Sequence, residues 1–147
     1  MEWTFRFVLA AAAVGICYLF QWRFLRYLTS ELNLRVDALF GVMLQRLSAD
    51  TVVWKGIVYH YENACIFADV WCASIPLLWA RSRTLSQNLP FITLYTSGLF
   101  VFNVLRLSFS DVLYAAGVPW SIAHNFVGGI AWFVVWIWIW KRVEKIG

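Results

Sequence analysis

The sequence has few charged residues. Only 14% of its 147 residues are Asp, Glu, Lys or Arg, whereas 62% are hydrophobic and ten are Trp. Soluble domains average about 25% charged residues, so this composition excludes an ordinary soluble domain and indicates an integral membrane protein in a lipid bilayer. The net charge of +4 gives no indication of nucleic-acid binding, and the length leaves room for a single domain, residues 1–147.

Cysteine and histidine are also scarce, with three cysteines and two histidines. Cys17, Cys65 and Cys72 lack the C-x-x-C or Cys/His spacing of a zinc site, so we expect no metal and no cofactor. Cys17 and Cys72 lie within apolar runs and are expected to act as small apolar side chains. The first apolar run is not followed by a small-residue cleavage site, which favours a retained membrane anchor over a signal peptide.

Four apolar runs predict four transmembrane helices, because about 20 apolar residues cross a hydrocarbon core about 30 Å thick. Their expected bounds are about 5–22, 64–80, 90–108 and 120–140. Pro90 is expected in the first turn of the third helix, where a proline is tolerated.

Two segments between the first and second runs have other periodicities. Residues 23–50 repeat apolar side chains at three- and four-residue steps, which predicts an amphipathic interfacial helix. Residues 51–61 are β-branched and aromatic around Lys55-Gly56, which predicts a short β-hairpin on the outer side. The hairpin would brace Cys65, present an edge to an extended peptide, or only connect its neighbours. The expected fold class is an all-α integral membrane protein with four transmembrane helices, this interfacial helix and this hairpin.

The basic residues predict an orientation. By the positive-inside rule, the loop with Arg81 and Arg83 and the tail with Lys141, Arg142 and Lys145 are cytoplasmic. We therefore expect a multi-pass protein of the cell (inner) membrane with both termini in the cytoplasm. One group of basic residues opposes this orientation, because it would then lie outside: Arg23, Arg26, Arg35 and Arg46.

Three chemically distinctive residues fall at one expected depth. Cys65, Arg106 and His124 lie 16 or 17 residues from the inner boundary of their helices, or roughly 24–26 Å above it. Ionisable groups inside a membrane segment are costly unless they are paired or line a wet cavity, so they are functional candidates. We expect the three side chains to share a pocket just beneath the outer surface.

Such a trio has coherent chemistry. Cys65 is a nucleophile if a nearby cation or base lowers the pKa of its thiol. Arg106 keeps its charge and would stabilise a thiolate or an oxyanion, and His124 is a natural general acid and base. Helical spacing adds three supporting candidates to these catalytic ones: Asn103, Asp69 and Gly128.

These residues resemble the exosortase/archaeosortase family of membrane transpeptidases. The resemblance rests on a cysteine after a β-like stretch (Cys65), an N-x-x-R pattern late in the next helix (Asn103 and Arg106), and a histidine followed by glycines (His124 and Gly128). It covers about residues 51–142. Where the family commonly has a small residue and a glycine after the cysteine, Ile66-Phe67 stands here.

The resemblance implies an enzyme that cleaves C-terminal sorting signals of exported proteins at the outer face of the membrane. Such a signal has a short motif, a membrane helix and a basic cytoplasmic tail. Cys65 would attack the scissile carbonyl, Arg106 would stabilise the charge, and His124 would protonate the leaving amine. The acyl group would then pass to an acceptor amine or to water.

Two alternatives from other functional classes stay open. The first is a non-enzymatic membrane subunit or assembly factor whose helices are held together by a buried Asp69–Arg106 pair. The second is a small transporter or proton-relay subunit that uses Asp69, Arg106 and His124. Both predict function without Cys65, and the second predicts dependence on Asp69.

Overall fold

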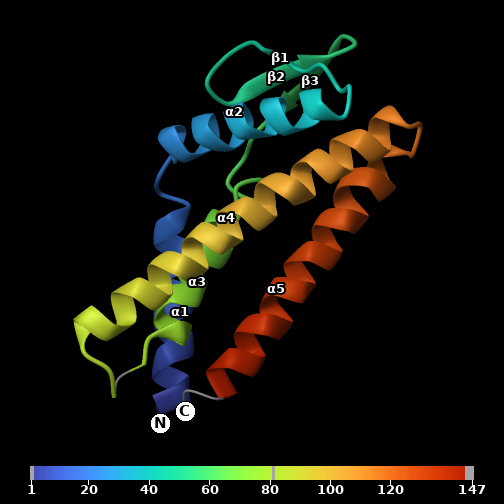
Figure 1. Cartoon of the computed structure of the whole chain (residues 1–147). Coiled ribbons are helices and arrows are strands. Elements are labelled where there is room, and N and C mark those ends of the chain that lie inside the picture. The colour runs from blue at the N-terminus through green and yellow to red at the C-terminus, as the bar shows by residue number, and fades with distance from the viewer. Residues whose placement is uncertain (1, 81, 145–147) are drawn as a thin grey trace.

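The structure is a computed structural model that describes residues 2–80 and 82–144, and it is mostly helical. Long helices α4 and α5 diverge from a shared turn, with α1 and α3 beside the first half of α4 and with α2 and a small sheet over its other end (Figure 1). In chain order the elements are α1 (Glu2–Cys17), α2 (Arg23–Leu39), β1 (Gln45–Arg46), β2 (Thr51–Trp54), β3 (Ile57–His60), α3 (Ala68–Leu78), α4 (Leu85–Ala115), the π-helical η1 (Ser121–Phe126) and α5 (Val127–Glu144).

The expectation of four membrane-spanning helices is wrong. Within the described residues, two helices are long and apolar enough to cross a membrane, Leu85–Ala115 and Ser121–Val143. α1 has 16 residues and α3 has 11, and at 1.5 Å per residue they reach only about 24 Å and about 16 Å, short of a core about 30 Å thick. The two long helices support membrane association.

Left-handed backbone marks where α2 and α3 begin. Trp22 has φ 49° and Phe67 has φ 54°, a conformation that cannot continue a right-handed helix. α3 therefore begins only after Phe67, so that Cys65 lies in a turn, and α2 begins after Trp22, beyond the short link that follows the end of α1 at Cys17. At the other end of α3, Trp79 is already extended.

α4 is longer than the expected 90–108 at both ends. A capping box formed by Thr84 and Gln87 starts it at Leu85, because each of these side chains satisfies a backbone N–H that the first turn leaves unpaired. Pro90 therefore lies in the second turn, not the first. The helix continues to Ala115 and stops before Gly117, whose φ is 94°.

The description as all-α is also wrong, because the chain contains a three-stranded antiparallel sheet in the order β1-β2-β3. The expected interfacial helix 23–50 ends at Leu39, since Gly41 adopts φ 79°, and the chain then forms β1. The expected hairpin is present between β2 and β3. Lys55 and Gly56 both have positive φ, as the tight two-residue turn of a hairpin requires.

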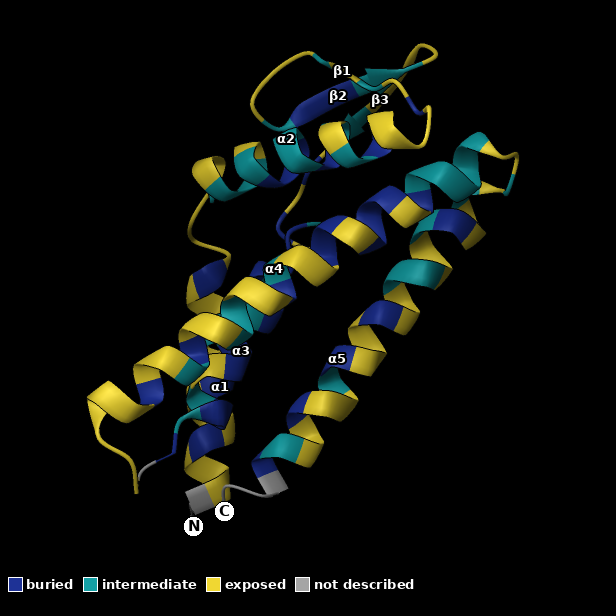
Figure 2. Cartoon of the chain, in the orientation of Figure 1, coloured by how far each residue is buried: buried dark blue, intermediate teal, exposed yellow. Residues whose placement is uncertain are grey.

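Burial follows the helix faces. One core cluster joins α1, α3, α4 and α5 through residues such as Val70, Leu99 and Val135. The outward faces of α4 and α5 are exposed and apolar (Figure 2), with Phe133 61% and Leu94 74% exposed. Contiguous apolar surface of this kind marks contact with lipid or with another protein.

Candidate functional site

The site is built around the buried side chain of Arg106 on α4. Its Nη2 atom donates to Oδ1 of Asn103 at 2.8 Å and to the backbone carbonyl of Cys65 at 3.3 Å. Asn103, three residues earlier and so on the same helix face, also donates from Nδ2 to the Cys65 carbonyl at 2.8 Å. The asparagine and the arginine therefore fix the backbone that carries the cysteine.

Cys65 lies in a compact turn between β3 and α3. Its N–H donates to the carbonyl of Glu62 at 3.0 Å, and the N–H of Ala68 donates to the carbonyl of Asn63 at 3.2 Å. Arg26 of α2 holds this turn from outside, because its Nη2 donates to Oδ1 of Asn63 at 2.8 Å. The cysteine is thus presented by a braced turn and not by the start of a transmembrane helix.

The Cys65 thiol is under opposing influences. Burial raises its pKa, while the hydrogen bond with the backbone of Glu62 and the positive charge of Arg106 act to lower it. Burial is the larger effect, so the pKa is raised overall. The thiol is therefore protonated at neutral pH, and nucleophilic chemistry needs a base to accept its proton.

The Nη1 nitrogen of Arg106 lies against α5. A Cβ atom on Gly128 would lie 3.3 Å from Nη1, so the glycine leaves just enough room for this nitrogen. The guanidinium carbon lies 4.9 Å from the ring centroid of Phe67. Nε is buried and has no hydrogen-bond partner among the described residues. Asn103 and the Cys65 carbonyl thus hold the guanidinium of Arg106 in place. They do not use all of its N–H donors.

His124 lies in the π-helical turn η1 at the start of the second long helix. Its ring stacks on Trp120, with centroids 4.4 Å apart and planes at 6°. The stack fixes the plane of the imidazole. Its Nδ1 atom is buried without a hydrogen-bond partner in the described part of the chain, so this nitrogen is available for proton transfer.

A cavity of about 400 Å³ brings most of these residues together. Five of the six candidates from the sequence border it: Cys65, Asp69, Arg106, His124 and Gly128. Asn103 lies behind the cavity, bonded to Arg106 and fully buried. The combination of a thiol, a guanidinium and an imidazole around one space can support nucleophilic attack on a carbonyl group.

The expected Asp69–Arg106 ion pair is not formed among the residues that the structure describes. Oδ1 of Asp69 is buried without a hydrogen-bond partner there, and Arg106 bonds to the asparagine amide and the cysteine carbonyl instead. Asp69 therefore borders the cavity as a separate polar group.

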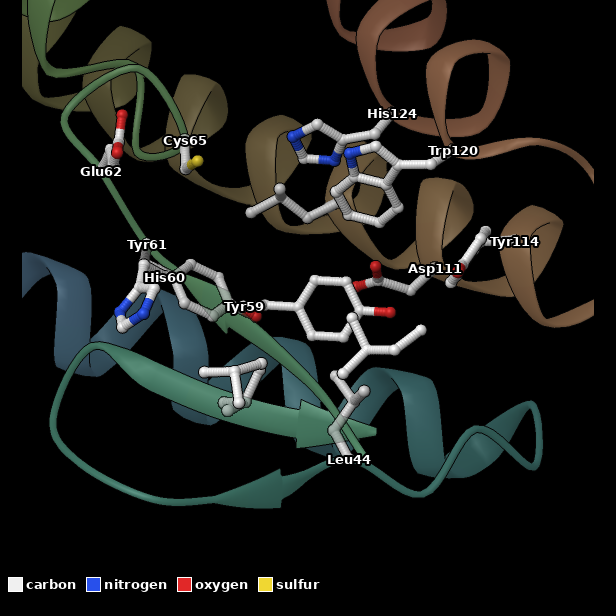
Figure 3. Close-up of a pocket in the computed structure, with 14 residues that line it drawn as sticks. Leu44, Tyr59, His60, Tyr61, Glu62, Cys65, Asp111, Tyr114, Trp120 and His124 are labelled. Carbon is white, nitrogen blue, oxygen red and sulfur yellow. The ribbon is translucent and has the colours of Figure 1, made fainter. Parts of the chain in front are cut away.

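A second cavity, of about 390 Å³, also borders Cys65 and His124. Figure 3 shows the sulfur of Cys65 pointing toward the side on which His124 lies, with Tyr59 and Asp111 farther down the cavity. Tyr59 packs on the ring of Trp120 at 5.1 Å between centroids. This cavity connects the sheet with the candidate catalytic residues.

Sequence reasoning missed Asp111 and the acidic pair to which it belongs. Nδ2 of Asn33 donates to Oδ2 of Asp111 at 2.9 Å and also to Asp37. Burial raises the pKa of Asp37 to about 6, although hydrogen bonds with Ser108, Asn33 and Asp111 act in the opposite direction. The available signal was an ionisable residue five positions after Arg106, but the expected helix ended at residue 108.

Metal binding has no support in the described part of the chain. No group of three or more His, Cys, Asp or Glu side chains there lies close enough to hold a metal ion. Comparison of the chain with protein-family models, with curated proteins and with solved structures found no match.

Proposed function

We propose that this protein is a membrane-embedded cysteine protease or transpeptidase that cleaves C-terminal sorting signals of exported proteins. The observation that carries the proposal is the cavity bordered by the Cys65 thiol, the Arg106 guanidinium and the His124 imidazole. The similarity of these residues to the exosortase/archaeosortase pattern supports the choice of substrate.

The proposed reaction begins with transfer of the thiol proton of Cys65 to His124. The thiolate attacks the scissile carbonyl carbon, and the free donors of Arg106 stabilise the negative oxygen that forms. His124 returns its proton to the leaving amine, which departs and leaves a thioester on Cys65. An acceptor amine or water then attacks the thioester with His124 as base, which releases the acyl product and restores the thiol.

Asn103 is a positioning residue in this scheme. It joins the Cys65 carbonyl and the Arg106 guanidinium through one fully buried amide. The amide therefore sets the separation between the nucleophile and the group that stabilises the oxyanion. Misplacement of about 1 Å can cost about a hundredfold in rate.

We further propose that the protein is multi-pass in the cell (inner) membrane, with both termini cytoplasmic and the site facing outward. Arg83 precedes α4, and Arg106 lies 23 residues later, or about 34 Å away along a helix. Lys141 and Arg142 lie in the last turn of α5, at the end remote from His124. Arg81 and Lys145, on which the prediction also rested, lie outside the described residues.

Three of the four basic residues that oppose this orientation form ion pairs with acidic side chains. Arg26 forms an ion pair with Asp50, and both Arg35 and Arg46 form ion pairs with Glu31. The cap formed by α2 and the sheet still carries five Lys or Arg against three Asp or Glu, and because the positive-inside rule counts Lys and Arg, it remains the feature that opposes this orientation.

The test is co-expression with an exported protein that carries a candidate sorting signal. Wild type is compared with Cys65→Ala and with the matched control Cys72→Ala, which removes another partly buried cysteine. We expect wild type and Cys72→Ala to release the shortened product and Cys65→Ala to leave the precursor intact. Equal processing by all three proteins would refute the proposal.

A proton-relay subunit is the second candidate, and one observation favours it. Oδ1 of Asp69 and Nδ1 of His124 both lack partners among the described residues, and both residues border the same cavity. This candidate predicts that Asp69→Asn abolishes function and that Cys65→Ala does not. The scaffold alternative has lost its main support, since Asp69 and Arg106 form no ion pair within the described chain.

A further inference from the structure

The outer edge of β3 is unpaired and borders the second cavity. In the described sheet, β3 pairs only with β2, in the register Val52↔Tyr59. The N–H of Tyr61 points toward β2, because it donates to the carbonyl of Asp50 at 2.8 Å. Backbone groups alternate in direction along a strand, so those of Val58 and His60 point away from β2, to the open edge.

The cavity runs along this edge and ends at the cysteine. Six consecutive residues from Ile57 to Glu62 border it, together with Cys65 and His124. Successive side chains of a strand point to opposite faces of the sheet, so a cavity bordered by every residue of β3 includes its edge, as well as the face of the sheet that carries Val52. Ile57 and Val58 are nearly half exposed there.

The second cavity is lined by acidic side chains and not by Lys or Arg of the described residues. Its lining residues include the carboxyl groups of Glu62 and Asp111 and contain no Lys or Arg among the described residues. Asn33 occupies Oδ2 of Asp111, and the carboxyl group lies at the wall of the cavity between the sheet and α4 (Figure 3). A bound group with hydrogen-bond donors or a positive charge complements this wall.

We infer that the edge of β3 binds the part of the substrate that precedes the scissile bond as an added β-strand, and that Asp111 selects a basic side chain in it. This inference rests on the proposed function and names the substrate's chemistry. An extended peptide pairs through its backbone with an open strand edge, while the pockets beside it select side chains. About four residues cover β3, since each residue of a strand spans about 3.3 Å.

The direction of the peptide follows from the chemistry. The scissile carbonyl must lie at Cys65, which follows the His60 end of β3. The residues before that carbonyl then extend toward the Ile57 end, so the peptide lies parallel to β3. The sequence that follows the scissile bond leaves toward α4, α5 and the membrane.

Disulfide capture at Cys65 tests this inference without requiring peptide cleavage. The probes are acetylated tetrapeptides, linked through a C-terminal cysteamine to 2-mercaptoethanol by a disulfide bond. The Cys65 thiolate attacks that disulfide, expels 2-mercaptoethanol and retains the peptide. One set consists of four alanine-based peptides, each with a single Lys at a different position. A matched set has Glu in place of Lys. The full chain is used, with its other two cysteines replaced by Ala.

The expected result is a capture preference of about tenfold for Lys over Glu at one position, as for a hydrogen bond to a charged group. Asp111→Asn should abolish this preference while keeping an acceptor oxygen for Asn33. N-methylation of a single peptide amide that faces β3 should reduce capture about fivefold, because each net backbone hydrogen bond contributes about 1 kcal/mol.

A variant of the edge itself separates backbone pairing from side-chain contacts. Val58→Pro removes an N–H at the open edge, where strands tolerate proline, and leaves the pairing with β2 in place. It should weaken capture of all the peptides, whereas Val58→Ala should keep the Lys preference and the sensitivity to N-methylation.

Three results would overturn the inference. One is capture that does not depend on peptide sequence, N-methylation or Val58→Pro. Another is a preference for Glu. The third is stronger capture of dodecanoyl-cysteamine than of every peptide, which would assign the cavity to a lipid chain. Failure of the proposed function has a different signature, since precursor processing would then persist in Cys65→Ala whatever the capture assay gives.

Discussion

Replacement of Gly128 by Ala tests how closely α5 approaches the guanidinium of Arg106. The added Cβ would lie 3.3 Å from Nη1, whereas a Cβ on the neighbouring Gly129 would meet nothing within 4 Å. Nη1 must then move by a few tenths of an ångström. The bond most exposed to this shift is the 3.3 Å contact of Arg106 with the Cys65 carbonyl, because it is already long.

The two alanine variants should differ in both stability and rate. Each gains up to about 1 kcal/mol from replacing a helical glycine. Gly129→Ala should keep that gain. Gly128→Ala should lose it again, since weakening a hydrogen bond from a charged group costs about 1.5 kcal/mol or more. Cleavage by Gly128→Ala should fall about tenfold, because displacement of a group that binds the oxyanion raises the barrier.

The assay combines thermal unfolding in detergent with single-turnover cleavage of a sorting-signal substrate. Gly129→Ala is the matched control and should cleave at the wild-type rate. Equal rates for the two alanine variants would refute the argument that Gly128 sets the position of Arg106. Equal losses would point instead to a general effect of stiffening the helix.

Two further predictions concern pH. The pKa of Asp37, about 6, exceeds the value of about 3.9 expected in the unfolded chain. The protonated form of Asp37 therefore stabilises the fold below about pH 4. This contribution, up to about 3 kcal/mol, is lost as the pH rises to about 6. Denaturant unfolding should therefore show a stability drop across this range that is smaller in Asp37→Asn, which keeps the neighbouring carboxyl group of Asp111, and equal drops in both proteins would contradict the assignment. For Cys65, the raised pKa predicts that alkylation by iodoacetamide still accelerates above pH 9, where an ordinary thiol is already ionised. Arg106→Gln should slow the reaction further and Arg106→Lys should restore most of it, whereas equal rates in all three proteins would exclude an effect of the charge.

Equal depth in the membrane predicts Cys65, Arg106 and His124 as neighbours, and the structure brings them to one cavity for partly different reasons. The prediction places Cys65 at the start of a transmembrane helix, whereas the cysteine lies in a turn that Asn103 and Arg106 hold through its carbonyl. Arg106 and His124 lie near the joined ends of α4 and the second long helix. Their roles in catalysis stay a prediction.

The missed features depend on contacts between segments remote in the sequence. β1 has only two residues and forms because Gly41 turns the chain back against β2, which periodicity within 23–50 does not reveal. Trp120 stands one helical turn before His124, and its stacking was available as a signal from spacing alone. Hydropathy also could not distinguish a short buried helix such as α3 from a membrane span, because both are apolar along their length.

The most direct test of the central claim is trapping of the acyl-enzyme on Cys65. The reaction of the full chain is quenched with acid during turnover, and its peptides are analysed by mass spectrometry. The peptide that contains Cys65 should carry an adduct. The mass of this adduct should equal that of the N-terminal cleavage product less one water. The adduct should be absent from Cys65→Ala and present in Cys72→Ala. Cleavage of the sorting signal by Cys65→Ala at the wild-type rate, with no adduct on the wild-type protein, would contradict the account.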